Sequence, residues 1–162
     1  MDLDDNRITI GKGVFLDDGI IFTSKPMMLK VENGQRRRVE AKARIVIEDN
    51  VNIGANSVIN LGVKNDTVIK KGVFIGHLAT IGHDSVIGEH TIVGAQACVL
   101  GEVVIGKWCF IASQSVIKPG VKIGDRTMIG MGSVVTRDIR GGVIAYGSPA
   151  KIIRKNLWRP DE

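Results

Sequence analysis

A six-residue repeat constrains this chain more than any other feature of its sequence. From residue 63 to residue 135, an isoleucine or valine stands at every sixth position without a break. The thirteen positions are Val63, Ile69, Ile75, Ile81, Ile87, Val93, Val99, Ile105, Ile111, Ile117, Ile123, Ile129 and Val135. The residue four places after each aliphatic is small or β-branched, from Thr67 to Ser133. Self-similarity over a fixed short period indicates a solenoid of stacked coils.

The repeat also predicts the cross-section of the solenoid. The small residue lies two places before the next aliphatic, so both point to the same face of a strand. One large and one small inward residue in every six describe short strands around a narrow core. Three such strands close a triangular coil of about eighteen residues. Glycine often follows the aliphatic, as at Gly76 and Gly94, and we expect it to turn the chain with positive φ.

We expect one domain, with a β-helix of about six coils over residues 1–140. The repeat is lost between residues 23 and 44, which we interpret as an excursion from the helix. Within it, Asn33-Gly34 is a strong hairpin turn signal between two alternating segments. The excursion is therefore predicted to be a two-stranded arm.

The tail, residues 141–162, lacks the repeat and belongs to the same domain. Ser148-Pro149 has the form of an N-cap followed by proline at the first helical position. Ile153 and Leu157 are four residues apart, which places them on one face of a helix. The sequence therefore predicts a short C-terminal helix over 150–158.

Composition narrows the class of protein. The net charge of +5 suits an anionic small ligand as well as it suits nucleic acid. The basic cluster Arg36-Arg37-Arg38 has no aromatic residue nearby, which favours a solvated loop over a nucleic-acid site. Cys98 and Cys109 lack CxxC spacing and are interpreted as structural thiols. We find no membrane span and no signal peptide, and we expect a cytoplasmic protein without a nucleic-acid partner.

The repeat resembles that of the hexapeptide-repeat acyltransferases, whose fold is a left-handed parallel β-helix. The stretch from Asn65 to Gly94 resembles the catalytic coil of sugar N- and O-acetyltransferases of the sialic-acid and bacillosamine type, and the β-helix part of lipid A N-acyltransferases. In these enzymes a histidine before D/N/E-x-V-I-G is the general base. The resemblance implies that His83, followed by Asp84, has this role.

Two further catalytic residues are expected near His83. Asp84 is the nearest carboxylate and is expected to hold the imidazole in the productive tautomer. Gly101 lies eighteen residues after His83, at the same corner of the next coil, and its bare backbone admits a ligand to the N–H. The family also places its oxyanion glycine one coil after the base. We therefore expect Gly101 to bind the oxyanion of the reaction and to contact the acyl-CoA donor.

The tail carries the donor site that the resemblance implies. The segment AYGSPAKIIR resembles the family ending G-x-P-A-K-x-I-R, which is matched by Gly147, Pro149, Ala150, Lys151, Ile153 and Arg154. We expect Lys151 and Arg154 to bind the phosphates of acetyl-CoA or another acyl-CoA.

His77 and His90 are also expected at corners that face outward, and we assign them to the acceptor. In bacillosamine-type enzymes a second histidine nine residues after the base contacts the acetyl donor, but here that position is Ile92. The resulting hypothesis is a CoA-dependent acyltransferase acting on a sugar amine or hydroxyl, for instance a nucleotide sugar used in surface polysaccharides.

Two alternatives compete with the acyltransferase. One is a zinc enzyme like the γ-class carbonic anhydrases, in which three histidines hold the metal. That family pairs two histidines five residues apart, whereas His77 and His83 are six apart, so we expect no metal. The other is a non-catalytic β-helix subunit that serves assembly.

Finally, the outward residues predict a homotrimer. One face carries Phe74, Ile92, Phe110 and Met128, a second Val68, Val86, Val104 and Lys122, and the third Thr80, Cys98, Val116 and Val134. The first column is a large apolar surface of the kind that marks an interface. Members of the family are trimers with sites between subunits.

Overall fold

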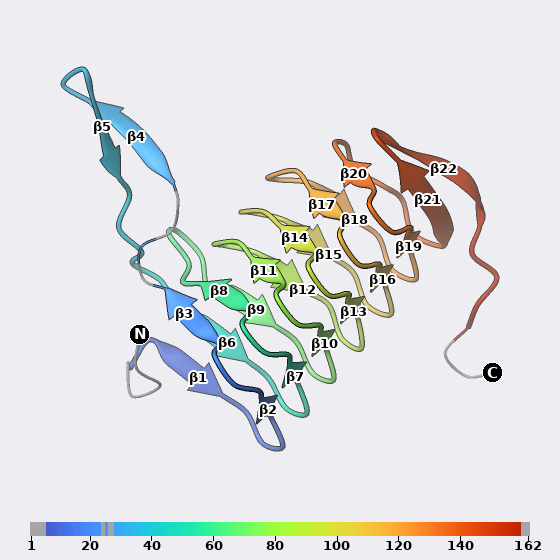
Figure 1. The fold of residues 1–162 in the computed structure, drawn as a ribbon, viewed down its shortest axis with the longest axis horizontal. Coiled ribbons are helices and arrows are strands. Elements are labelled where there is room, and N and C mark those ends of the chain that lie inside the picture. The colour runs from blue at the N-terminus through green and yellow to red at the C-terminus, as the bar shows by residue number, and fades with distance from the viewer. Residues whose placement is uncertain (1–5, 24, 26–27, 160–162) are drawn as a thin grey trace.

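The chain folds into a three-sided prism of stacked coils (Figure 1). The computed structural model describes residues 6–23, 25 and 28–159, and within these residues it contains strands but no helix. Face A consists of β1 (Ile8–Ile10), β6 (Ile45–Ile47), β9 (Thr67–Ile69), β12 (Val86–Ile87), β15 (Val104–Ile105) and β18 (Lys122–Ile123). Face B consists of β2 (Phe15–Leu16), β7 (Asn52–Ile53), β10 (Phe74–Ile75), β13 (Ile92–Val93), β16 (Phe110–Ile111), β19 (Met128–Ile129), β21 (Val143–Gly147) and β22 (Ala150–Lys155). Face C consists of β3 (Ile21–Thr23), β8 (Val58–Asn60), β11 (Thr80–Ile81), β14 (Cys98–Val99), β17 (Val116–Ile117) and β20 (Val134–Val135).

The strands of each face stack in parallel register from one coil to the next. On face B, Phe74 lies beside Ile92, Ile92 beside Phe110, and Phe110 beside Met128. Faces A and C align the two other expected columns in the same way. These features confirm an all-β parallel β-helix of about six coils, in agreement with the left-handed class that the resemblance implied.

The core consists of the residues that the repeat assigns to it. Ile69, Ile75 and Ile81 are fully buried, one from each face. The small inward residues line the corners, where several bond the turn of the next coil. Ser85 Oγ, for example, donates to the Leu100 carbonyl oxygen at 2.9 Å. A small polar side chain at this place fills the corner and satisfies a backbone carbonyl that the parallel ladder leaves open.

The glycines that follow the aliphatic residues have a different role from the one expected. Positive φ occurs two places later in the turn, at residues such as Leu78, Asp84 and Gln96, and not at Gly76 or Gly94. A Cβ at Gly76 would come 2.5 Å from the amide nitrogen of Ala95 in the next coil. Glycine is therefore required by the close passage of the neighbouring backbone, and the prediction of positive φ was wrong.

The three corners of the prism differ in how much their length varies. Between described strands, every turn from face A to face B and from face B to face C contains four residues, as in 48–51 and 54–57. The turns from face C to face A vary: residues 24–44 separate β3 from β6, and residues 61–66 separate β8 from β9. All irregularity within the stack thus lies along the C–A corner.

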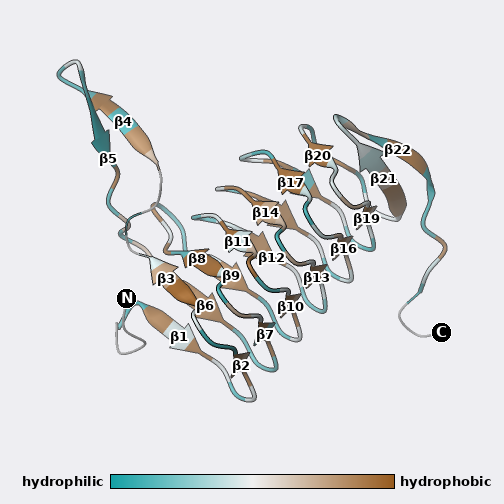
Figure 2. Ribbon diagram, in the orientation of Figure 1, coloured by the Kyte–Doolittle hydropathy of each residue, from teal (hydrophilic) through white to brown (hydrophobic). Residues whose placement is uncertain are grey.

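The excursion forms the predicted arm. Strands β4 (Leu29–Glu32) and β5 (Gln35–Arg38) pair antiparallel, and Asn33 and Gly34 both have positive φ in the turn between them. The arm projects from the prism, and every residue of its two strands is exposed, Val31 by 75% (Figure 1). Figure 2 shows that β4 alternates hydrophobic and hydrophilic residues, whereas β5 is hydrophilic. The arm thus has no hydrophobic core of its own.

The predicted C-terminal helix over 150–158 is absent. Residues Ala150–Lys155 instead form β22, which pairs antiparallel with β21, the last strand of face B. Ser148-Pro149 is a cis peptide in the turn between the two strands. Pairing satisfies the backbone of β22 along the open edge of the stack, and this tertiary contact overrides the helical pattern of Ile153 and Leu157.

Among the described residues, no helix is long and apolar enough to cross a membrane.

Candidate active site

His83 lies at the C–A corner, at the edge of a cleft of about 790 Å³ on face C. The corner contributes Gly82, His83, Leu100, Gly101, Glu102, Pro119 and Gly120, face C contributes Ile21, Thr23, Val58, Asn60 and Thr80, and the base of the arm contributes Lys25, Met28 and Leu29. The cleft is mostly apolar with a few polar groups near His83, which is the usual character of a small-molecule site.

His83 and Asp84 form a close pair. The Nδ1 atom of His83 lies 2.8 Å from Oδ2 of Asp84, and their side chains are 16% and 2% exposed. A carboxylate at Nδ1 favours the tautomer with the proton on that nitrogen, which leaves Nε2 as an acceptor. Within the described part of the chain, Nε2 has no hydrogen-bond partner, and His83 lines the cleft. The arrangement suits a general base.

The second oxygen of Asp84 anchors a loop. Its Oδ1 accepts the backbone N–H groups of Val63, Lys64 and Asn65 at 2.9, 2.9 and 2.7 Å. Burial acts to raise the pKa of Asp84, but the hydrogen bonds from His83 and from these three amides outweigh it and hold the pKa below its ordinary value. Asp84 is therefore a carboxylate at neutral pH and fixes both the imidazole and the loop.

Gly101 lies against the His83 ring. A Cβ at this position would come 2.5 Å from Nε2, so a side chain here would displace the imidazole. At other corners a side chain of the next coil caps the equivalent amide, as Asp125 Oδ1 accepts the Lys107 N–H at 2.9 Å. The residue above Gly101 is Pro119, and among the described residues nothing accepts the Gly101 N–H. A free backbone donor thus lies beside Nε2.

The two other histidines lie at the other two corners. His77 is at the B–C corner, where its Nδ1 accepts the Ala55 N–H at 2.9 Å and lies 3.7 Å from Asp17. His90 is at the A–B corner, where its ring stacks on Trp108 with 4.3 Å between ring centroids. Within one chain, neither histidine joins His83, so the acceptor role predicted for them is not supported by one chain alone.

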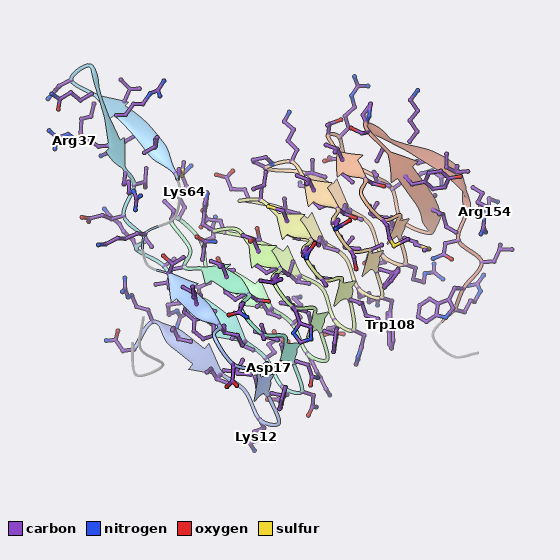
Figure 3. All side chains as sticks on the ribbon, in the orientation of Figure 1. Lys12, Asp17, Arg37, Lys64, Trp108 and Arg154 are labelled. Carbon is purple, nitrogen blue, oxygen red and sulfur yellow. The ribbon has the colours of Figure 1, made fainter. Side chains whose placement is uncertain are left out.

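Lys151 and Arg154 lie on β22, at the end of face B (Figure 3). A register shift in the hairpin pairs them with Tyr146 and Ile144, which lie two residues apart on β21, so both cations project from the same face. Face B is opposite the C–A corner, and one chain therefore does not bring these cations to His83. Phosphate binding by this pair stays a prediction.

The histidine positions bear on the zinc alternative. The three rings lie at three corners, so one chain does not gather them around one ion. Among the described residues, His83, Asp84 and Glu102 are the one group whose ligand atoms lie close together, within 4.8 Å. Both oxygens of Asp84 and Nδ1 of His83 already form hydrogen bonds, so this group fits a metal poorly.

The cysteines do not join the cleft. Both are free thiols, and Cys109 is buried. Burial raises the pKa of the Cys109 thiol to about 11, which keeps it protonated at neutral pH. A structural role for Cys109 agrees with the prediction.

Sequence reasoning missed two groups. Met28 and Leu29 line the His83 cleft from the base of the arm, and nothing in the repeat signals this. Trp108 (Figure 3) is the centre of an aromatic group in which the ring centroid of Trp158 lies 6.0 Å away, and both rings line a second hollow of about 390 Å³ on face B. The eighteen-residue spacing of His90 and Trp108 would have placed the first two rings together.

Family models match the repeat region. The model described as bacterial transferase hexapeptide (six repeats) matches residues 66–101, 84–119 and 102–137, and that described as hexapeptide repeat of succinyl-transferase matches 44–77. Together they span residues 44–137, which is more than half of the chain.

Curated relatives extend the match. A UDP-3-O-acylglucosamine N-acyltransferase of Methylobacterium nodulans is 30% identical over 146 residues, 90% of this chain and 42% of the relative. An enzyme of the same name from Herminiimonas arsenicoxydans is 33% identical over 132 residues, 82% of this chain and 38% of the relative. The chain spans less than half the length of these two relatives.

Solved structures share the architecture. The UDP-N-acetylglucosamine acyltransferase of Francisella novicida has a TM-score of 0.81 at 17% identity, and the match covers 96% of this chain and 60% of that one. LpxA from Acinetobacter baumannii has a TM-score of 0.75 at 23% identity, with 96% and 68% covered. At these identities the likeness concerns the fold.

Proposed function

Because the chain belongs to the hexapeptide-repeat family of bacterial transferases, we propose that it is an acyltransferase that moves an acyl group from acetyl-CoA or another acyl-CoA to a sugar. The observation that carries the proposal is the His83–Asp84 pair at the edge of an apolar cleft. The curated relatives, which are named for an acylated UDP-glucosamine, support an amino sugar linked to a nucleotide as acceptor. We place the reaction in the cytoplasm, in the synthesis of a surface polysaccharide.

The geometry supports a single proton-transfer path. Nε2 of His83 takes the proton from the attacking amine or hydroxyl as the new bond forms at the thioester carbon. Asp84, which is ionised and hydrogen-bonded to Nδ1 of His83, stabilises the imidazolium. The free N–H of Gly101 donates to the oxyanion of the tetrahedral intermediate. When the carbon–sulfur bond breaks, His83 returns the proton to the thiolate of CoA.

A homotrimer would complete this site. Five of the six B–C turns, those between residues 54 and 133, contain no Lys, Arg, Asp or Glu, and only the first turn, 17–20, carries charge, whereas each A–B turn from residue 48 to 127 contains at least one charged residue. An uncharged corner is the one that can be buried around a threefold axis. Face B of one subunit would then pack on face C of the next and bring His90, Lys151 and Arg154 towards a neighbour's His83.

The catalytic proposal is tested by His83→Ala. We expect kcat with acetyl-CoA and an amino-sugar acceptor to fall by about 10²- to 10⁴-fold, the usual loss for a general base. The melting temperature should fall by only a few degrees, because the ring lies outside the core and the main loss is its hydrogen bond to Asp84. His77→Ala is the control for histidine loss. Activity within a few-fold of wild type would refute the assignment and favour a non-catalytic role or another base.

The trimer is tested by a disulfide. Ile92 on face B and Cys98 on face C lie in the same coil, so a threefold axis parallel to the prism places them at one height in adjacent subunits. Ile92→Cys should therefore cross-link to Cys98 into covalent trimers under mild oxidation. Val104→Cys on face A is the control and should not. A monomer mass in light scattering would contradict the assembly.

A further inference from the structure

The net charge of the chain resides in the arm region. Residues 23–44 contain seven Lys and Arg against two Glu, a net charge of +5, and the whole chain, with 22 basic and 17 acidic residues, also has +5. The other 140 residues therefore carry 15 charges of each sign and are neutral. A hairpin of two strands is marginally stable alone in water. A bound partner of opposite charge would therefore stabilise this exposed, charged arm.

The arm borders two hollows of different character. Leu29 and Met28 line the apolar His83 cleft. The next residue along the strand, Lys30, lines a hollow of about 710 Å³ between the arm and the loop at residues 63–64. The residues of this hollow, which we call the basic hollow, are Lys30, Glu32, Arg37, Arg38, Val39, Glu40, Lys42, Val63 and Lys64. Leu29 and Lys30 are adjacent on the strand and point to opposite sides of the arm, whereas their cross-strand partners Arg38 and Arg37 both reach the basic hollow.

The cations of the basic hollow are only partly neutralised. Glu32 pairs with Lys30 at 3.3 Å and with Arg37 at 4.0 Å. Arg38, Lys42 and Lys64 have no carboxylate within ion-pair distance among the described residues. The hollow is lined by five cations and by two carboxylates, Glu32 and Glu40, and such an excess of arginine and lysine on a concave surface is suited to phosphate oxygens.

The basic hollow is joined to the catalytic residues by a hydrogen-bonded loop. Lys64 and Val63 line the hollow, and their backbone N–H groups bind Oδ1 of Asp84 at 2.9 Å each. The other oxygen of the same carboxylate holds His83. One carboxylate therefore bonds both the loop that lines the basic hollow and His83, and the arm contributes residues to both hollows.

We propose that the basic hollow binds the phosphate groups of a phosphorylated acceptor whose sugar lies in the His83 cleft. The hollow that His83 lines is mostly apolar, and the basic hollow is lined by more cations than carboxylates, which together match a ligand with a sugar or acyl part and an anionic part. This inference rests on the proposed function for the identity of the ligand as acceptor. Anion binding itself can be measured without turnover.

The probes are inorganic pyrophosphate, uridine diphosphate and CoA, titrated by calorimetry into the full-length protein. The variant is Arg38→Gln with Lys64→Gln, and the matched control is Lys12→Gln with Lys122→Gln, which removes two exposed charges elsewhere (Figure 3). We expect the variant to bind pyrophosphate and uridine diphosphate about 10- to 100-fold more weakly, since each charge-assisted hydrogen bond contributes a factor of about ten in affinity. CoA affinity should be unchanged, and Arg38→Lys with Lys64→Arg should restore binding.

Three outcomes would overturn the proposal. Pyrophosphate and uridine diphosphate fail to bind, or bind the variant as they bind wild type. The variant binds CoA more weakly but binds the other two probes normally, which would mean that the hollow binds the acyl donor. Wild type but not the variant sediments with anionic phosphatidylglycerol vesicles while pyrophosphate does not bind, which assigns the arm to a membrane surface. A melt of each variant verifies folding. Loss of activity in His83→Ala tests the proposed function separately from these titrations.

Discussion

The prism and the arm show two ways in which one chain uses β-strands. In the prism, apart from β21 and β22, strands of two or three residues pair with the coils above and below, their inward aliphatic side chains are buried, and the charges outside residues 23–44 balance. In the arm, strands of four residues pair only with each other and bury nothing, and the segment 23–44 that contains them has a net charge of +5. The comparison teaches that the repeat provides stability, while the arm, the longest departure from it, adds exposed charge beside the cleft that His83 lines.

The largest effect is expected in the prism. Ile105→Ala removes a fully buried side chain from the middle of face A and should reduce the free energy of unfolding by about 2–5 kcal/mol. Urea denaturation followed by circular dichroism, at one fixed protein concentration, measures it. Val104→Ala, whose side chain points outward from the same strand, is the control. A loss below about 1 kcal/mol would mean that the coil collapses around the cavity.

Gly101→Ala separates catalysis from folding at the C–A corner. The added Cβ would meet Nε2 of His83, so the imidazole must move. We expect kcat/KM to fall about 10²-fold, as for other small displacements of a catalytic group, with little change in melting temperature. Ser113→Ala, at the same turn position of the B–C corner, should keep full activity. An active Gly101→Ala enzyme would show that the ring has room to move productively.

Asp84→Asn tests the carboxylate that joins the loop to His83. We expect a loss of about 1–3 kcal/mol at pH 7, because one acceptor of His83 and the charge that binds three amides are removed. The folded pKa of Asp84 is lowered, so its stabilising contribution is complete above its ordinary pKa of about 3.9 and is lost as the pH falls through the lowered value. The gap between wild type and variant should therefore narrow in acid.

Thermal melts from pH 7 to pH 3 measure this gap. Asp18→Asn, an exposed aspartate on the B–C corner, serves as the control and should change stability little at any pH. A gap between wild type and Asp84→Asn that stays constant down to pH 3 would contradict the role of the ionised carboxylate.

The smallest effect is expected in the arm. Val31→Ala removes a side chain that is 75% exposed, and the free energy of unfolding should change by less than about 0.5 kcal/mol. The same denaturation experiment used for Ile105→Ala allows direct comparison. A loss above 1 kcal/mol would mean that Val31 is buried in solution against another molecule, and the contrast between arm and prism would fail.

The parts of the fold that follow from local rules were predictable from the sequence. The six-residue period places Phe74, Ile92 and Phe110 in one column, and Asn33-Gly34 specifies the arm. The C-terminal helix was wrong because Ile153 and Leu157 have helical spacing, while the edge of face B offers β22 a strand partner. That edge exists because β21 pairs with β19, and this tertiary contact is not contained in a local pattern.

The site shows the same limit. The positions of His83 and Gly101 follow from eighteen-residue spacing, and the structure places them in contact. The contact between His83 and Asp84 depends on the turn that contains them, since neighbours in a strand point apart. Asp84 has φ of 58°, and this reversal of the chain lets adjacent side chains meet. The contribution of Met28 and Leu29 depends on where the arm stands, which the sequence does not specify.

The C–A corner has a consequence for how such a protein can change over time. Along this corner the chain already accommodates segments of 21 and six residues between strands, at 24–44 and 61–66, while the stack above and below keeps its register. Insertions there cost little, because closing a longer loop adds only about 0.6 kcal/mol for each doubling of its length. New recognition surfaces can therefore be grafted beside an unchanged His83. For an engineer, it is the edge of the molecule on which to exchange loops when a different acceptor is wanted.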